Sequence, residues 1–363
     1  MTGKKWVRAF LILFISTICA IALIVAFVDP FFHYGPPKKY FFYRLYDQRS
    51  QNDGITRYFD YDSIVTGTSM AENFKTSLFD ELFSANAIKV TYAGATYKEL
   101  NDNLKVAFDS GHRPRYVFRP IDYSLLLKDK DEMRIDMGEY PVWLTNKNPF
   151  DDVKYLLNRD VILTYTVPEI LGFLRGDSPG YTSFDEYSYT GNADDYDREL
   201  VLSVKWEFNA PEKINDVTEA DIKMVSENIE QNVVSLAREH PDTTFIYFFP
   251  PYSMAYWGAV REEGNLDRYI YLVRMAAEQM LECDNIHVYC FGFEEDVTSD
   301  LTLYRDVAHY NPYVSDLIME KIASLEFSGD NQDADRLRVN RQNIDTYFDD
   351  LRDYIENFDY ESL

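Results

Sequence analysis

The sequence has few of the residues that cross-link a chain or hold a metal. Among 363 residues there are three cysteines, Cys19, Cys283 and Cys290, and five scattered histidines. Cys283 and Cys290 are seven residues apart, and the second lies in an expected strand, so their sulfurs are too distant to bridge. No spacing of cysteine and histidine is typical of zinc. We therefore expect free cysteines, no metal and no cofactor.

Glycine-rich phosphate-binding motifs are also absent. The sequence contains neither G-x-G-x-x-G nor G-x-x-x-x-G-K-[ST]. In such loops the backbone N–H groups approach a phosphate closely. Their absence argues against a P-loop enzyme or a dinucleotide-binding enzyme.

Basic residues are outnumbered, with 36 Lys and Arg against 61 Asp and Glu. Beyond residue 29 the counts are 33 and 60, a net charge of −27. A surface of this sign repels nucleic acid and anionic lipid headgroups, so nucleic acid is not an expected partner. A solvated acidic face is sufficient to explain the charge.

One long apolar run is present near the start. Residues Ala9 to Val28 are 20 consecutive positions without a charge. A helix of that length spans roughly 30 Å, the thickness of a bilayer core. A cleaved secretory signal is the alternative, but the run is long for one and no A-x-A site follows it. Lys4, Lys5 and Arg8 precede the run and favour a single-pass anchor in the cell membrane with the rest of the chain outside.

After residue 61, short apolar segments alternate with helical patterns. The expected strands are 63–66, 88–92, 116–121, 245–249 and 286–291, and the expected helices are 70–83, 97–108, 266–281 and 313–325. Strands separated by helices pair in parallel and bury both faces of their sheet. We predict an α/β fold with a five-stranded parallel sheet covered on both faces.

The predicted organisation has four segments. Residues 1–29 form the cytoplasmic end and the transmembrane anchor, 30–60 an irregular juxtamembrane segment, and 61–327 the α/β domain. The alternation breaks at 122–219, which is rich in Tyr, Asp, Gly and Pro and is predicted to be an insertion at the active edge, with helix around 150–175. Residues 328–363 form an acidic tail ending in a helix.

Two motifs carry candidate chemistry. Ser69, in Gly67-Thr68-Ser69-Met70, comes just after the first strand, and Asp306 and His309 follow the last strand in an Asp-x-x-His pattern. Ligands bind at the carboxyl ends of strands in an open parallel sheet, so these side chains are expected at one edge. A hydroxyl, an imidazole and a carboxylate form a nucleophilic triad. Taken alone, a hydroxyl at this position is most often only a helix N-cap, and an Asp-x-x-His is usually a solvated helix start.

Other residues follow strands at the same edge. Gly94 ends the second strand and is a candidate oxyanion donor, because glycine lets the backbone approach a ligand closely; a plain turn glycine is the alternative. Pro251 and Tyr252 end the fourth strand and are candidates for one wall of the pocket, or mark only the end of the strand.

These residues resemble the SGNH/GDSL hydrolase superfamily. Its Gly-Asp-Ser-Leu-like first block is similar to residues 67–70, its second-block glycine to Gly94, and its final Asp-x-x-His to residues 306–309. The resemblance covers roughly residues 60–125 and 240–325 and implies a flavodoxin-like three-layer fold, a serine nucleophile and no metal. Residues 52–55, 61–62 and 67–74 are similar to membrane-anchored SGNH-like proteins of Gram-positive bacteria, and more distantly to the D-alanyl transfer protein of the teichoic-acid pathway, which implies work on surface glycans.

One block departs from the superfamily. Its third block carries an asparagine that donates to the oxyanion, whereas Asp122, Tyr123 and Ser124 stand after the third strand here. Asp122 and Tyr123 are therefore candidates for another role in the site. We expect an esterase or O-acyltransferase acting on acylated cell-surface glycans or small acyl esters. The alternative is an inactive module that binds a cell-wall polymer or a partner protein, which suits the many aromatic residues; the sequence says nothing about oligomeric state.

Overall fold

The computed structural model describes residues 3–136, 141–146, 148–192, 195–203, 206–327 and 334–363. The chain folds into two compact units. Unit 1 comprises residues 1–60 and 135–183, and unit 2 comprises residues 61–134 and 184–363. The expected insertion at 122–219 is thus divided, since its middle belongs to unit 1 and its two ends to unit 2.

Unit 1 begins with the long helix α1 (Gly3–Val28), which is apolar and long enough to cross a bilayer, a test that a signal sequence near the N-terminus also passes. The end of this helix packs into a small core, where Val25 and Phe31 meet Tyr155 and Val161. The remaining elements are short: β1 (Phe42–Tyr43), α2 (Gln48–Tyr58), η3 (Val142–Leu144), α5 (Val153–Leu156), η4 (Val161–Thr166), α6 (Val167–Arg175) and β5 (Gly180–Tyr181). β1 and β5 pair in parallel.

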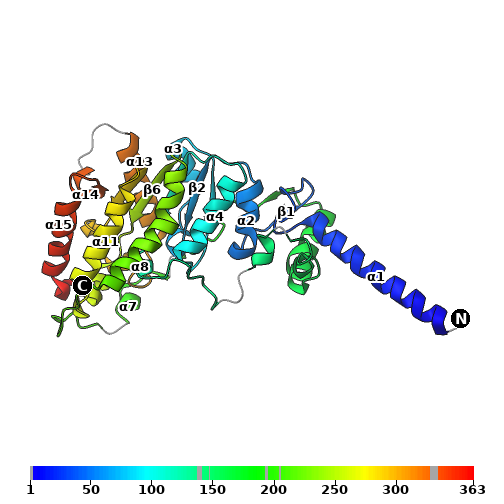
Figure 1. The fold of residues 1–363 in the computed structure, drawn as a ribbon, viewed down its shortest axis with the longest axis horizontal. Coiled ribbons are helices and arrows are strands. Elements are labelled where there is room, and N and C mark those ends of the chain that lie inside the picture. The colour runs from blue at the N-terminus through cyan, green and yellow to red at the C-terminus, as the bar shows by residue number, and fades with distance from the viewer. Residues whose placement is uncertain (1–2, 137–140, 147, 193–194, 204–205, 328–333) are drawn as a thin grey trace. The chain divides into compact units, whose positions relative to one another are not determined.

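Unit 2 contains a six-stranded, mostly parallel sheet (Figure 1). The strands are β2 (Ser63–Gly67), β3 (Ala87–Thr91), β4 (Tyr116–Pro120), β6 (Thr244–Phe249), β7 (Ile286–Cys290) and β8 (Arg338–Val339), in the spatial order β3-β2-β4-β6-β7-β8. β2 and β3 are buried along their whole length, as expected for parallel strands covered on both faces. The mixed α/β fold with a mostly parallel sheet was correctly predicted from the alternation.

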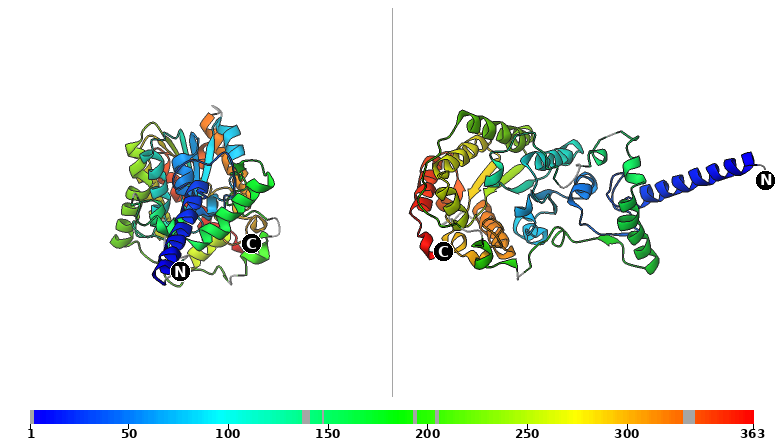
Figure 2. Two further views of the ribbon diagram at one scale, coloured as in Figure 1. Left: turned by 90° about the vertical axis from the view of Figure 1, so that its right-hand side faces the viewer. Right: turned by 90° about the horizontal axis from the view of Figure 1, so that it is seen from below.

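Helices cover both faces of this sheet (Figure 2). On one face lie α4 (Tyr97–Asp109), α8 (Glu219–Ile229) and α11 (Leu266–Met280), and on the other lie α3 (Thr76–Phe83) and α13 (Pro312–Phe327). The other helical elements are η1 (Ser69–Ala71), η2 (Tyr123–Leu125), α7 (Arg198–Val201), η6 (Glu230–Val234), α9 (Ser235–Glu239), α10 (Met254–Glu262), α12 (Glu295–Thr298), η7 (Leu301–Leu303), α14 (Ala334–Leu337), α15 (Ile344–Asn357) and η8 (Tyr360–Ser362).

The prediction of one helix over 70–83 was wrong. A 3₁₀ turn, η1, comes first, and α3 begins only at Thr76. The cause is a distant carboxylate, because Asp185 accepts hydrogen bonds from the backbone N–H of Ser77 and from the hydroxyls of Thr76 and Ser77. This contact caps α3 in place and separates it from η1. Ser69 is therefore not at the N-terminus of an α-helix.

Several further elements were not predicted, among them β8 and α2. The sheet has a sixth strand, the antiparallel β8, whose two residues are too few to show a pattern. Residues 48–58 form α2 and not an irregular segment. This helix buries polar residues, since the Gln51 amide donates to the carbonyls of Pro30 and Arg44 and accepts from the N–H of Tyr46. A helix with a polar buried face has no apolar periodicity in its sequence.

Candidate active site

The candidate nucleophile lies directly beyond β2. Gly67 ends this strand with φ of +152°, and a Cβ there would come within 2.7 Å of the Ala71 side chain and 2.9 Å of Pro120. Glycine is therefore required to pack η1 against β4. Thr68 caps η1 by accepting a hydrogen bond from the N–H of Met70. Ser69 is the first residue of this turn and is partly exposed.

Ser69, His309 and Asp306 form one hydrogen-bonded chain. Ser69 Oγ lies 2.8 Å from His309 Nε2, and His309 Nδ1 lies 2.7 Å from Asp306 Oδ2. Because a carboxylate accepts at Nδ1, that nitrogen carries the proton and Nε2 is left to accept from the Ser69 hydroxyl. The structure thus brings together the three residues that the sequence placed at one sheet edge.

A tight turn holds Asp306 and His309 together. Asp306 Oδ1 accepts from the backbone N–H groups of Ala308 and His309, while its other oxygen accepts from the ring. Burial disfavours the charged carboxylate, but the hydrogen bond and charge of His309 outweigh it and lower the pKa of Asp306 to about 2. Burial likewise disfavours the imidazolium, but the hydrogen bond and charge of Asp306 raise the pKa of His309 above its ordinary value. The site therefore stabilises a protonated His309.

The turn is attached to the segment after β6. Ser253 donates both its N–H and its hydroxyl to the carbonyl of Val307, at 3.1 and 2.8 Å. The hydroxyl of Tyr304 donates to the carbonyl of Pro251 at 2.6 Å. Neither Ser253 nor Tyr304 stood out in the sequence as a positioning residue, because each acts through a backbone carbonyl that only the fold brings near.

Asp122 is buried and contacts Thr68, the residue before the candidate nucleophile. Its carboxylate accepts from the hydroxyls of Thr68 at 2.9 Å and Tyr252 at 3.2 Å, and its backbone carbonyl accepts from the hydroxyl of Tyr97 at 2.7 Å. Burial raises the pKa of Asp122 to about 6, against the effect of these two hydroxyl donors and the charge of His309. Asp122 and Tyr252 thus position Thr68, the residue that precedes Ser69.

Two backbone donors near the site have no acceptor. Within the described residues, the N–H groups of Ser69 and Gly94 make no hydrogen bond. Gly94 has φ of +61°, and the Arg134 guanidinium lies against it, so a Cβ would be 1.5 Å from Nη1. This guanidinium donates to the neighbouring carbonyl of Ala93. The two free amides are available to a negatively charged oxygen.

Two other candidate residues lie away from solvent. Tyr123 is buried, stacks on Phe249 and meets Trp257 edge to face, so its ring packs in the core. Pro251 is also buried and contributes its carbonyl to Tyr304. Over the described parts of the chain, no group of three or more His, Cys, Asp or Glu side chains is arranged to hold a metal ion.

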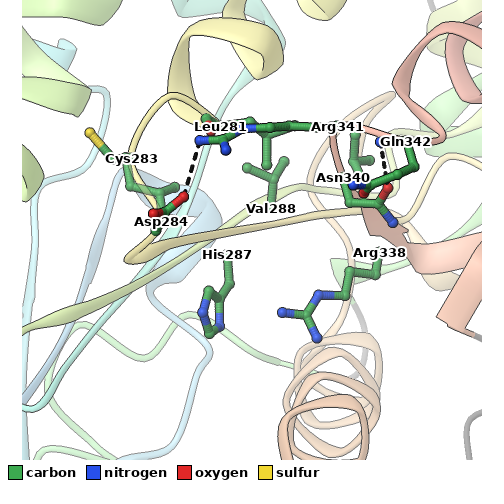
Figure 3. Close-up of a pocket in the computed structure, with 11 residues that line it drawn as sticks. Leu281, Cys283, Asp284, His287, Val288, Arg338, Asn340, Arg341 and Gln342 are labelled. Carbon is green, nitrogen blue, oxygen red and sulfur yellow. Dashed lines mark hydrogen bonds and ion pairs between the residues drawn. The ribbon is translucent and has the colours of Figure 1, made fainter.

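One cavity of unit 2 lies away from these residues. It has a volume of about 240 Å³ and lies at the amino end of β7, where Arg341 reaches across to Asp284 at 3.1 Å (Figure 3). Because the triad follows the carboxyl ends of the strands, this cavity is not part of the candidate active site. His287, which lines it, has its Nδ1 2.6 Å from Glu326 Oε1.

No protein-family model matches the chain, and a search of curated proteins finds no matching sequence.

Proposed function

We propose that this chain is a membrane-anchored serine esterase or O-acyltransferase of the SGNH/GDSL type, acting outside the cell on acyl esters of surface glycans. The observation that carries the proposal is the chain of hydrogen bonds from Ser69 through His309 to Asp306. This is the arrangement of a nucleophile, a general base and an orienting carboxylate.

The fold supports the same superfamily. The parallel strands run β3-β2-β4-β6-β7, which is the second-first-third-fourth-fifth order of flavodoxin-like sheets. The nucleophile follows the first strand of that sheet and the histidine follows the last. The glycan substrate rests on the more distant resemblance to the D-alanyl transfer protein of the teichoic-acid pathway, which implies work on surface glycans.

In the first half of the proposed reaction, His309 Nε2 takes the proton of the Ser69 hydroxyl as Oγ attacks the acyl carbonyl carbon. The N–H groups of Ser69 and Gly94 donate to the oxygen that becomes negative. His309 then gives its proton to the departing alcohol, and the acyl group stays on Ser69 as an ester. The raised pKa of His309 makes it a strong enough base for the first proton transfer.

In the second half, His309 takes a proton from water or from a glycan hydroxyl, and the resulting nucleophile attacks the acyl-enzyme. Ser69 leaves with the proton returned by His309. Water as acceptor makes the protein an esterase, and a sugar hydroxyl makes it a transferase. Turnover measured with and without a sugar acceptor separates the two.

The proposed cellular arrangement rests on α1. A helix of this length and apolarity suits a single-pass anchor, with the basic residues before it on the cytoplasmic side. The catalytic unit would then face outward, where surface glycans are.

A second candidate function is an inactive module that binds a polymer. It is favoured by Asp122, which stands where the superfamily has an asparagine donor and which here accepts from Thr68 and Tyr252. An acceptor at this position cannot donate to an oxyanion while it is ionised.

Covalent labelling of the full chain in detergent with a fluorophosphonate probe tests the proposal. We expect one adduct on Ser69, located by mass spectrometry, because the probe reacts only with an activated serine hydroxyl. The adduct should disappear in the His309→Ala variant and persist in Ser110→Ala, which removes an exposed hydroxyl at the end of α4. Folded wild-type protein that takes no label would favour the binding module.

A further inference from the structure

The helix of residues 161–175 in unit 1 exposes apolar side chains and buries an acidic one, which is the reverse of the usual pattern for a protein in water. Its exposed positions include Leu163, Val167, Leu171 and Leu174, which recur every three or four residues along one face, and Leu174 is 70 % exposed. Its buried positions include Glu169 and Gly172. A helix at a water-facing surface normally presents the opposite pattern, with apolar residues inside and charges outside.

The buried acidic residue of this helix is Glu169. Glu169 is 6 % exposed, and one of its oxygens is buried without a hydrogen-bond partner. Burial raises the pKa of Glu169 to about 9, with a further contribution from the charge of Asp29. The chain therefore keeps a neutral carboxyl inside unit 1 while several leucines remain outside.

This helix is next to the apolar helix α1. Val161, at its start, shares a core with Val25 at the end of α1 and with Phe31 just beyond it. Figure 2 shows the segment, in green, lying across the end of α1 and not along it. If α1 runs through a bilayer, a crosswise helix at its end lies in the plane of the membrane surface.

The neighbouring residues suit the same environment. Exposed apolar residues continue into the preceding segment, where Phe150 is 88 % exposed and Val153 is also exposed. Aromatic side chains at Tyr40 and Tyr46 are exposed as well. Tyrosine is enriched at membrane–water interfaces, where an apolar ring and a polar hydroxyl are both satisfied.

Unit 1 is nearly neutral, so an anionic lipid surface would not repel it. Unit 1 carries 12 Lys and Arg against 11 Asp and Glu, whereas unit 2 carries 24 against 50. An anionic lipid surface repels unit 2 and leaves unit 1 nearly unaffected.

We propose that the apolar face formed by Leu163, Val167, Leu171 and Leu174 lies in the headgroup region of the bilayer, as a second membrane contact beside α1. A helix with a strong apolar face binds there by burying that face at the boundary of the acyl chains. The inference requires that α1 enters the membrane and is independent of the proposed catalysis.

Fluorescence of the full chain in vesicles of phosphatidylcholine and phosphatidylglycerol tests it. An environment-sensitive dye is attached at Leu174→Cys in a Cys19→Ala background, where the two remaining cysteines are buried. The matched control is Ile214→Cys, because Ile214 is 59 % exposed in unit 2. The wild-type chain labelled at Cys19 reports separately on α1.

We expect the dye at Leu174 to emit at shorter wavelength than the dye at Ile214 and to be quenched by lipids carrying a nitroxide at the headgroup. Equal emission and no quenching at both positions, with the dye at Cys19 quenched, would overturn the proposed contact of the 161–175 helix with lipid. It would leave the α1 anchor intact. A blue-shifted dye at Leu174 that nitroxide lipids do not quench would also overturn it, since the face would then be covered by protein.

Discussion

The two units of this chain bury and expose opposite kinds of residue. Unit 2 has a conventional interior, with apolar strands covered by helices and a charge excess of 26 acidic residues on 254 residues. Unit 1 is nearly neutral, exposes a row of leucines on one helix and buries Glu169. A single solvent does not favour both patterns, so the comparison indicates that the two units meet different surroundings.

The two units also bury their carboxyl groups in different ways. In unit 2 the buried carboxyl of Asp122 accepts from two hydroxyls and lies beside the candidate triad. In unit 1 the buried carboxyl of Glu169 has an oxygen with no partner. Burial raises both pKa values. At Asp122 the two hydroxyl donors and the charge of His309 limit the rise to about 6, whereas at Glu169 no hydrogen bond opposes burial and the charge of Asp29, and the pKa is about 9.

The largest expected effect is on catalysis in unit 2. Asp306→Asn should reduce ester turnover on the order of 10³–10⁴-fold, because an amide no longer holds His309 in the tautomer that accepts from Ser69. The same change should lower the pKa of His309 toward its ordinary value, which NMR titration of the ring measures. An unchanged His309 pKa would mean that the close contact with Asp306 does not persist in solution.

Next is the pH dependence of unit 1. The folded pKa of Glu169 is raised from 4.5 to about 9, so its contribution to stability is fully present below pH 4.5 and is lost as pH rises toward 9. Between these two pKa values unfolding releases one proton from Glu169, so the free energy of unfolding falls by at most about 1.4 kcal/mol for each pH unit. Thermal unfolding of the full chain in detergent from pH 5 to pH 8 measures it.

Glu169→Gln is the informative variant for that series. Its neutral amide cannot ionise, so the unfolding temperature of unit 1 should vary less with pH than in the wild type. Equal pH dependence in both proteins would show that Glu169 is solvated or paired in the folded chain.

A smaller effect is expected at the turn before the nucleophile. Gly67→Ala should destabilise unit 2 by about 3 kcal/mol, since a Cβ there meets Ala71 and Pro120 in addition to the strain of a positive φ. Gly111→Ala is the control, because Gly111 has φ of +92° but open space around it, and should cost only about 1 kcal/mol. Chemical denaturation compares the two, and similar losses would mean that the close packing at Gly67 relaxes freely.

The smallest effect on stability is expected on the exposed face of unit 1. Leu174→Ser should change the unfolding free energy in detergent by no more than about 0.5 kcal/mol, because the side chain is already exposed. In vesicles the same variant should weaken the contact of the 161–175 helix with lipid. A large loss of stability in detergent would place Leu174 in a protein core and remove the contrast between the units.

Much of unit 2 was predictable because its signals are local. Each parallel strand is a short run of buried residues, and α4 carries a capping box of Thr96 and Glu99 that is readable within four positions. The α1 helix was predictable for the same reason, since residues 9–28 form one uncharged apolar run. By contrast α2 was missed, since Gln51 on its buried face is satisfied by carbonyls of residues outside the helix.

The three residues of the candidate triad were predictable, but the residues that position them were not. The order of Ser69, Asp306 and His309 along the chain, and their positions after strands, are sequence properties, and they place all three at one edge of a parallel sheet. Ser253 and Tyr304 escaped prediction because they act on distant carbonyls.

By itself, the sequence determined the parallel strands, the apolar helix, the excess of acidic residues beyond residue 29 and the triad candidates, because these are carried by short motifs or by composition. Only the tertiary structure decided that α3 begins at Thr76, that Asp122 lies under Thr68, and that the helix of 161–175 turns its leucines outward. The physical reason is that a side chain is capped, paired or exposed according to groups far away in sequence, and the folded chain alone brings those groups together.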